Sequence, residues 1–302
     1  MTNNVAYVTI CVNKGEKMQN IAILTDTNSG IMQDEPEQNL YVIPMPVIID
    51  GDEYFEGKNI THPDFYVKQT GGSNIKTSQP SVGIVNEMWD KLLQDYENII
   101  YIPMSSALSS SCQSALSEAQ NSKYKGKVWV VDNKRISCAQ KTAAYEACKL
   151  AKRELSVQEI VKYLLDTQKE NTIYISIPDL KYLKKGGRLT PAAAILGTML
   201  SIKPVLTIQN GKLDSFAKCF TFNACKVKML NALKKDIETR FAGKKIKVFM
   251  AYTQNLEQAL DFKKTIEETL HLPVEIVDEL SISIAVHIGP GALACGCAID
   301  CD

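Results

Sequence analysis

The sequence predicts an α/β protein with two α/β domains and mainly parallel sheets. Short apolar runs of strand length alternate with amphipathic segments of helix length almost throughout the chain. The 302 residues are enough for two such domains. Apolar residues make up 45% and charged residues 23%, which is ordinary for a globular protein.

The expected strands are apolar runs bounded by polar or turn-forming residues. In chain order they are Ile21–Asp26, Leu40–Val47, Ile99–Pro103, Val128–Asp132, Thr172–Ile177, Val205–Ile208, Ile246–Tyr252 and Val274–Val277. The first of them, "IAILTD", has the continuous apolar character of a buried parallel strand.

Helices are expected between these strands. In "SVGIVNEMWDKLLQDYE" the apolar residues recur at helical spacing, and Ser81 is a suitable N-cap directly after Pro80. The segment "SVQEIVKYLLDTQ" begins with Ser156 and has Glu159 three residues later, which predicts a capping box.

The domain boundary is expected at the polar stretch Lys169–Asn171. This gives an N-terminal α/β domain over residues 21–170 and a C-terminal α/β domain over residues 171–302. Residues 1–20 are interpreted as an N-terminal extension, because the regular pattern begins only at Ile21. A native start at Met18 in place of Met1 is an alternative.

The charge balance limits the partners. Lys plus Arg and Asp plus Glu both number 34, and a protein without a basic excess is not expected to bind nucleic acid nonspecifically. The N-terminus lacks the apolar region of a signal peptide, so a cytoplasmic location is expected. The longest apolar run, Leu189–Leu206, contains Pro191, Gly197 and Lys203 and is too short to cross a bilayer.

The nine cysteines are expected to be reduced thiols. Cys295, Cys297 and Cys301 have a C-x-C-x3-C spacing, but no second pair or nearby histidine accompanies them. We therefore expect no metal site and no cofactor.

The first candidate binding stretch is "KTSQPSVG", in which Thr77 and Ser78 precede a helix start. Simple N-capping is the alternative interpretation of these hydroxyls. A nucleotide phosphate loop is excluded, because that motif requires glycine directly before the lysine and here Ile75 precedes Lys76.

The second stretch is "IIYIPMSSALSSSCQSALSEA", a strand that leads through a serine-rich turn into a helix. Ser109 and Ser110 lie at the expected helix start, where free backbone N–H groups and hydroxyls can bind an anion. The alternative is a solvated serine loop.

The remaining candidates are Arg188 and His287. Arg188 follows the pair Gly186–Gly187 and leads into an apolar helix with a thin surface formed by Ala192, Ala193, Ala194 and Gly197. Such a surface either packs closely or leaves room for a slender apolar ligand. His287 precedes "IGPG" and is one of three histidines; a histidine at a strand end beside a turn is the simpler interpretation.

Taken together, the motifs resemble the DegV family. "ILTDTNSG", "KTSQPSVG", "SSALSSSCQSA", "VVDNKRIS", "IPDLKYLKKGGRLT" and "HIGPGALA" occur in the family's order from about Ile21 to the C-terminus. Members are bacterial fatty-acid-binding proteins, and some present the bound acid to a fatty acid kinase.

The resemblance implies a lipid-binding carrier with a ligand tunnel and cleft between its two domains. The fatty acid tail would lie in the tunnel, with Thr77 and Ser109 bonded to the carboxylate, beside Ser78, and with the backbone N–H of Ser110 facing it. Arg188 and His287 would form an outer polar network. Its expected partners are a long-chain fatty acid, a fatty acid kinase subunit and, transiently, a membrane surface.

Two departures from the family pattern matter most, and a third, Ala285 two residues before the histidine, is mild. Ser110 stands where glycine is usual, and Phe220–Thr221 stands where an Arg-Thr pair is usual after the "GKL" hairpin. The first departure is expected to affect the approach to the ligand, and the second is expected to affect either the docking of a partner or the charge of the cleft.

The alternative function is a serine hydrolase or acyltransferase that acts on lipid esters with Ser109 and His287. Asp26 is the best candidate to orient the histidine. The nucleophile-elbow motif G-x-S-x-G is missing from the sequence, so we favour a carrier that is not an enzyme.

Overall fold

The computed structural model describes residues 20–188 and 202–301. Most of the expected N-terminal extension, with Met18, and the expected thin helix surface at Ala192, Ala193, Ala194 and Gly197 lie outside the described residues.

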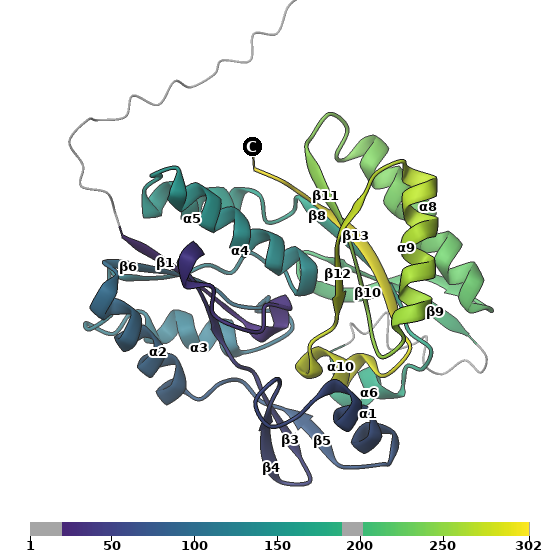
Figure 1. Cartoon of the computed structure of the whole chain (residues 1–302), viewed down its shortest axis with the longest axis horizontal. Coiled ribbons are helices and arrows are strands. Elements are labelled where there is room, and N and C mark those ends of the chain that lie inside the picture. Colours follow the sequence, from purple (N-terminus) through teal and green to yellow (C-terminus); the bar gives the residue numbers. More distant parts are fainter. Residues whose placement is uncertain (1–19, 189–201, 302) are drawn as a thin grey trace, which may run out of the picture.

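The first sheet has four parallel strands in the order β2-β1-β6-β7, as the sequence predicts for this half. Its strands are β1 (Ile21–Asp26), β2 (Leu40–Ile43), β6 (Asn98–Ile102) and β7 (Val128–Val130). Helices cover both of its faces: α4 (Ser137–Lys152) and α5 (Val157–Asp166) on one side, α2 (Val82–Asp95) and α3 (Ser111–Glu118) on the other (Figure 1). This arrangement is typical of parallel sheets, which are buried on both faces.

A small sheet, made of three short antiparallel strands in the order β4-β3-β5, follows β2. It consists of β3 (Pro46–Ile49), β4 (Asp52–Phe55) and β5 (Ile75–Thr77), with α1 (His62–Thr70) between the last two. The predicted single strand Leu40–Val47 is therefore wrong. The chain leaves the first sheet after Ile43, because Pro44 has no N–H group to continue the ladder.

The second sheet has six strands in the order β10-β9-β8-β13-β11-β12. They are β8 (Asn171–Ser176), β9 (Lys203–Gln209), β10 (Lys212–Cys219), β11 (Ile246–Tyr252), β12 (Val274–Glu279) and β13 (Leu293–Ile299). The α/β class is confirmed, but the expectation of mainly parallel strands is wrong for this sheet, where β11–β12 is the parallel pair among the described strands. The reason is partly local: Asn210 and Gly211 both have positive φ, 49° and 75°, and form a two-residue turn that reverses the chain between β9 and β10.

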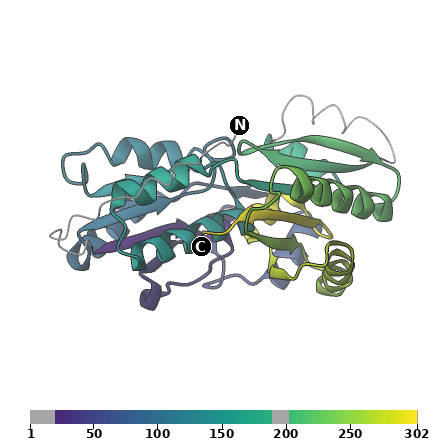
Figure 2. The same cartoon turned by 90° about the horizontal axis from the view of Figure 1, so that it is seen from above.

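The two faces of the second sheet have different neighbours. Helices α8 (Phe222–Thr239) and α9 (Leu256–Leu270) cover one face, where Tyr174 and Met250 point. Alternate residues, among them Ile175 and Phe249, point to the opposite face and toward the first sheet. The first sheet with α2, α3, α4 and α5 is called the first unit, and the second sheet with α8 and α9 is called the second unit; Figure 2 shows them side by side. In the described part of the chain, none of the helices has the length and apolar character needed to cross a bilayer.

Helices α6 (Lys181–Gly186) and α10 (Ile282–Ile288) pack together next to the small sheet (Figure 1). Two short 3-10 turns, η1 (Thr27–Ser29) and η2 (Pro36–Gln38), complete the first unit. The helix α10 belongs in sequence to the C-terminal half, yet its apolar residues Ile282, Ala285 and Val286 are buried against the small sheet and α1.

Candidate functional site

A cavity of about 350 Å³ lies between the first unit and the second sheet. Its volume is in the range of small-molecule binding sites. The sheet contributes an apolar wall of alternate residues: Ile173, Ile175, Ile208, Leu213, Phe249, Ala251 and Ala294. Met104, Leu108 and Ile136 close it from the side of the first unit, so the cavity is a gap in the core between the two units.

All six residues that the sequence predicts for the site line this cavity. They are Thr77, Ser78, Ser109, Ser110, Arg188 and His287. They come from the end of β5, the turn before α3, the turn after α6 and the last turn of α10. The fold thus brings four distant stretches of chain to one polar end of an apolar cavity.

Thr77 and His287 form the central contact of this polar end. The Thr77 Oγ1 and His287 Nε2 atoms are 2.9 Å apart, although the residues are separated by 210 positions in sequence. His287 lies in the last turn of α10, so the simpler interpretation of a strand-end histidine is wrong. Gly289 ends the helix with φ of 78°, and its N–H donates to Ala285 O at 2.8 Å.

His287 is held neutral by its surroundings. Burial, and next the nearby Arg188 guanidinium, lower the pKa of His287 from 6.5 to about 4. Its Nδ1 atom is buried and has no hydrogen-bond partner among the described residues. The ring lies so close to α6 that a Cβ at Gly186 would be 2.2 Å from Nδ1.

Ser109 and Ser110 lie at the start of α3 and bond in different directions. Ser109 Oγ donates to Ser111 Oγ at 3.1 Å and accepts the Ser111 N–H at 3.2 Å. Ser110 Oγ donates to Gln79 Oε1 at 2.9 Å. Ser110 has φ of −76°, so the replacement of the usual glycine causes no backbone strain.

Gln79 was not among the predicted site residues, although it lies within the quoted motif "KTSQPSVG". Its Oε1 atom accepts hydrogen bonds from both Ser110 and Ser114, at 2.9 and 3.1 Å. It lines the cavity and ties the turn after β5 to the start of α3. Because Ser110 and Ser114 lie 31 and 35 positions from Gln79 in sequence, these hydrogen bonds cannot be predicted without the fold.

Ser78 and Arg188 lie at the rim. Ser78 is exposed, and its Oγ donates to the backbone O of Gln79 at 3.1 Å. Arg188 is also exposed, and its Nη1 donates to the backbone O of Gly186. Both therefore border the cavity without contacting the Thr77–His287 pair through a hydrogen bond in the described structure.

The contacts of Ser109 and His287 do not support the hydrolase alternative. A serine nucleophile needs a hydrogen bond to its histidine base and a third group that orients the base. Within residues 20–188 and 202–301, Ser109 bonds to Ser111 and His287 bonds to Thr77. The Asp26 carboxylate is fully buried and accepts bonds from Asn28, Gln140 and the Met104 N–H instead.

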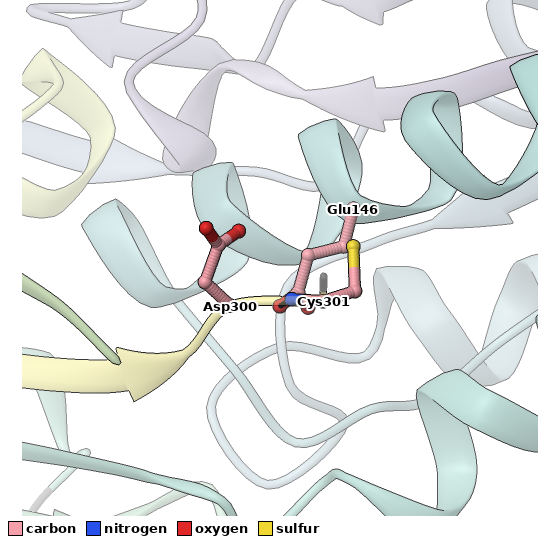
Figure 3. Close-up of side chains that lie close together, drawn as sticks. All are labelled: Glu146, Asp300 and Cys301. Carbon is pink, nitrogen blue, oxygen red and sulfur yellow. Dashed lines mark hydrogen bonds between the residues drawn. The ribbon is translucent and has the colours of Figure 1, made fainter. Parts of the chain in front are cut away.

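A group of potential metal ligands lies elsewhere, where the C-terminal end of the chain meets α4. Ligand atoms of Glu146, Asp300 and Cys301 lie within 4.8 Å of one another (Figure 3). Cationic side chains already neutralise both carboxylates: Arg135 lies 3.5 Å from Glu146, and Asp300 is paired with Lys149, Lys245 and Lys247 at 2.6, 3.4 and 3.5 Å. This group is therefore an ion-pair network.

The cysteines of the C-x-C-x3-C pattern do not converge. Cys295 and Cys297 of β13 are buried on the face of the second sheet that α8 and α9 cover. Cys301 packs in the core of the first unit. Burial raises the pKa of the Cys295 thiol to about 12, so this thiol stays protonated at neutral pH.

Comparisons with known proteins identify the family of the chain. A family model described as "Uncharacterised protein, DegV family" matches residues 20–300. A DegV domain-containing protein of Lactococcus lactis is 30% identical over 284 residues, which cover 91% of this chain and 97% of that relative.

Two solved structures have the same fold. A structure described as fatty acid binding of a DegV family protein from Thermus thermophilus has a TM-score of 0.84 and 27% identity, covering 93% of this chain and 99% of that one. DegV of Bacillus subtilis, described as a fatty acid binding protein, has a TM-score of 0.81 and 25% identity, covering 93% of this chain and 100% of that one.

Proposed function

The chain belongs to the DegV family, and from this premise we propose that it binds a long-chain fatty acid in the cavity between its two units. The observation that carries the proposal is an apolar cavity with a cluster of neutral hydroxyls at one end. The Thermus thermophilus and Bacillus subtilis relatives, described as fatty acid binding proteins, share this fold.

The apolar wall would supply most of the binding free energy. A sixteen-carbon acid buries about fourteen methylenes, each contributing roughly 0.8 kcal/mol, or about 11 kcal/mol before the costs of association. Micromolar to nanomolar affinity corresponds to about 8 to 12 kcal/mol. The polar end therefore has to select the head group and its position in the cavity, and needs to contribute little further affinity.

The hydroxyls of Thr77 and Ser109 would bond the carboxylate, with the Ser110 N–H facing the same group. A neutral His287 that carries its proton on Nε2 donates to Thr77 Oγ1. The hydroxyl hydrogen of Thr77 is then free to point at a carboxylate oxygen. In this arrangement the histidine orients the threonine, and Arg188 adds positive charge at the rim.

We further propose that the bound acid is taken from a membrane surface and presented to a fatty acid kinase. A carboxylate oxygen would attack the terminal phosphoryl group of the kinase's nucleoside triphosphate, giving an acyl phosphate and a nucleoside diphosphate. Phe220, which is 79% exposed, replaces the arginine usual in the family and gives any docking surface there an apolar residue in place of a charge.

Lipid mass spectrometry on the purified protein tests the binding proposal. The wild type should carry long-chain fatty acid, and Thr77→Val and Ser109→Ala should bind added fatty acid about tenfold more weakly, because each loses one hydrogen bond to a charged group. The matched controls are Thr265→Val and Ser117→Ala, exposed residues on α9 and α3. A wild type that is empty and ignores added fatty acid would disprove the proposal.

The presentation step has its own test. Loaded protein is incubated with ATP, an extract of the source cells and hydroxylamine, which traps acyl phosphates as hydroxamates. Hydroxamate that forms in the presence of hydroxylamine only when loaded protein, ATP and extract are all present supports the kinase step. Its absence, with a lipid-loaded carrier, would reject that step and leave the binding proposal standing.

A further inference from the structure

Helix α10 forms part of the cavity wall, and side chains from the N-terminal half of the chain hold it in place. Ser283, Ile284, His287 and Ile288 of this helix line the cavity. The side chain of Gln69, in the last turn of α1, donates through Nε2 to the backbone O atoms of Ala285 and Val286 at 3.0 and 3.3 Å. Gln69 thus ties the last turn of α1 to the backbone of α10.

The N-terminus of α10 is capped by Glu56, which directly follows β4. Glu56 Oε2 accepts the N–H of Ile282, the first residue of the helix, at 2.7 Å. The preceding residue, Ser281, makes no side-chain cap bond, so a carboxylate 226 positions away in sequence takes that role. A carboxylate at a helix N-terminus is favoured by the free N–H groups and the helix dipole.

His62 holds Glu56 in place. Its Nε2 atom lies 3.3 Å from Glu56 Oε1 and 3.0 Å from the backbone O of Leu280. Both neighbours are acceptors, so Nε2 carries a hydrogen. The side chains are 22% exposed for His62 and 9% for Glu56, which leaves the pair little access to solvent.

The other titratable groups that face the pair are Glu279, at the end of β12, and Tyr66, on α1. Burial raises the pKa of Glu56, while His62 and the Ile282 N–H lower it and Glu279 raises it further. The pair is therefore a partly buried contact in which His62 favours the ionised form of Glu56.

The same small sheet carries both contacts to the two ends of α10. Glu56 follows β4, Thr77 ends β5, and both strands pair with β3. We infer that Glu56 and His62 are positioning residues: they fix the start of α10, so that His287 in its last turn meets Thr77 and the cavity selects a free carboxylate. This inference rests on the proposed fatty acid binding.

The test compares a long-chain fatty acid with its methyl ester, which has the same tail but no charge. Dissociation constants of both ligands are measured for wild type, Glu56→Ala, Glu56→Gln and His62→Gln, with Glu53→Gln on exposed β4 as the control. Glu56→Ala should weaken binding of the acid about tenfold and of the ester less than twofold, as expected for loss of one charge-assisted hydrogen bond.

If Glu56→Ala folds poorly, two conservative variants still test the positioning role. Glu56→Gln retains an acceptor for the Ile282 N–H and should restore part of the preference for the acid, and His62→Gln should behave similarly. Equal weakening of acid and ester, or no change in either, would overturn the positioning role. A wild type that binds neither ligand would instead reject fatty acid binding itself.

Discussion

The Thr77–His287 contact depends on an imidazole that stays uncharged. A protonated ring would place a second positive charge beside Arg188 inside a buried site, and burial disfavours this. The neutral ring can donate from one nitrogen only, and the Thr77 hydroxyl can both donate and accept, so the direction of their hydrogen bond follows the tautomer of the ring.

The lowered pKa of His287 predicts a pH dependence of stability. The unfolded chain takes up the proton near pH 6.5 and the folded chain only near pH 4, so the unfolded state binds more protons between these values. Stability should therefore fall as the pH drops from about 6.5 to about 4, by on the order of 3 kcal/mol. Denaturant unfolding at a series of pH values measures this slope.

His287→Gln should flatten that slope, whereas His271→Asn at the exposed end of α9 should leave it intact. An NMR titration of the three histidine rings gives an independent measurement. A His287 ring that titrates near its ordinary value in the ligand-free protein would contradict the neutral imidazole. Adding fatty acid should raise the pKa of His287, because the carboxylate brings a negative charge close to the ring.

Gly186→Ala tests how closely α6 packs on the histidine. The new Cβ would lie 2.2 Å from Nδ1 and 3.1 Å from Cε1 of His287, so the ring has to shift and its contact with Thr77 is disturbed. We expect a loss of about 1–3 kcal/mol in the free energy of unfolding and weaker binding of the free acid. Gly83→Ala in α2 is the matched control, since its nearest neighbour lies 3.8 Å away. If both variants bind like the wild type, the contact does not position His287.

At the scale of elements, the sequence alone predicted a strand or a helix start correctly where it has a continuous apolar run or a capping motif. The predicted bounds Ile21–Asp26 and Ile246–Tyr252 match β1 and β11, and the capping box of Ser156 and Glu159 is confirmed at the start of α5. Whether two strands pair in parallel or antiparallel cannot be predicted in this way, because it depends on pairing between residues far apart in sequence.

The missed strands show this limit. β13 has the sequence "LACGCAI", in which small residues give little strand signal, yet it lies between β8 and β11 at the centre of the second sheet. β10 is an edge strand whose polar and apolar residues alternate irregularly around a bulge. Neither could be recognised as a strand without its neighbours.

For a related reason, the polar residues of the site could be predicted from the sequence and the apolar wall could not. Its polar end lies on short motifs that the family resemblance identifies, and these residues do line one cavity. The apolar wall consists of alternate residues of β8, β9, β10, β11 and β13. The sequence does not say which alternate set faces the ligand and which faces α8 and α9.

The capping box offers a prediction that separates stability from binding. Ser156 accepts the Glu159 N–H at 3.3 Å and its own N–H donates to the Glu159 carboxylate at 2.8 Å, and neither residue lines the cavity. Ser156→Ala should cost about 1 kcal/mol in the free energy of unfolding. The dissociation constant for fatty acid, measured in parallel well below the melting temperature, should stay unchanged. A weaker affinity would mean that α5 is coupled to the cavity.

For the whole molecule, the two units are joined at separate places around the cavity. One of these places is near the C-terminus. There the Ile299 N–H donates to the backbone O of Glu170 at 3.1 Å, and the Cys301 N–H donates to the Glu146 carboxylate at 3.2 Å. Below them in Figure 1, α10 packs on the small sheet. The cavity walls come from both units, and a bound tail would therefore contact both.

This arrangement predicts that ligand stabilises the molecule as one unit. A ligand that binds only the folded state adds about 2.7 kcal/mol at a free concentration one hundred times its dissociation constant. Delipidated protein should therefore melt at a lower temperature than loaded protein, and the melting temperature should rise with added fatty acid. Hydrogen exchange locates the effect: amides of Met104 in the first unit and Ile175 in the second sheet, which both line the cavity, should gain protection together. If only one of the two amides gained protection, the ligand would be held by a single unit, and the cavity between the sheets could not be its site.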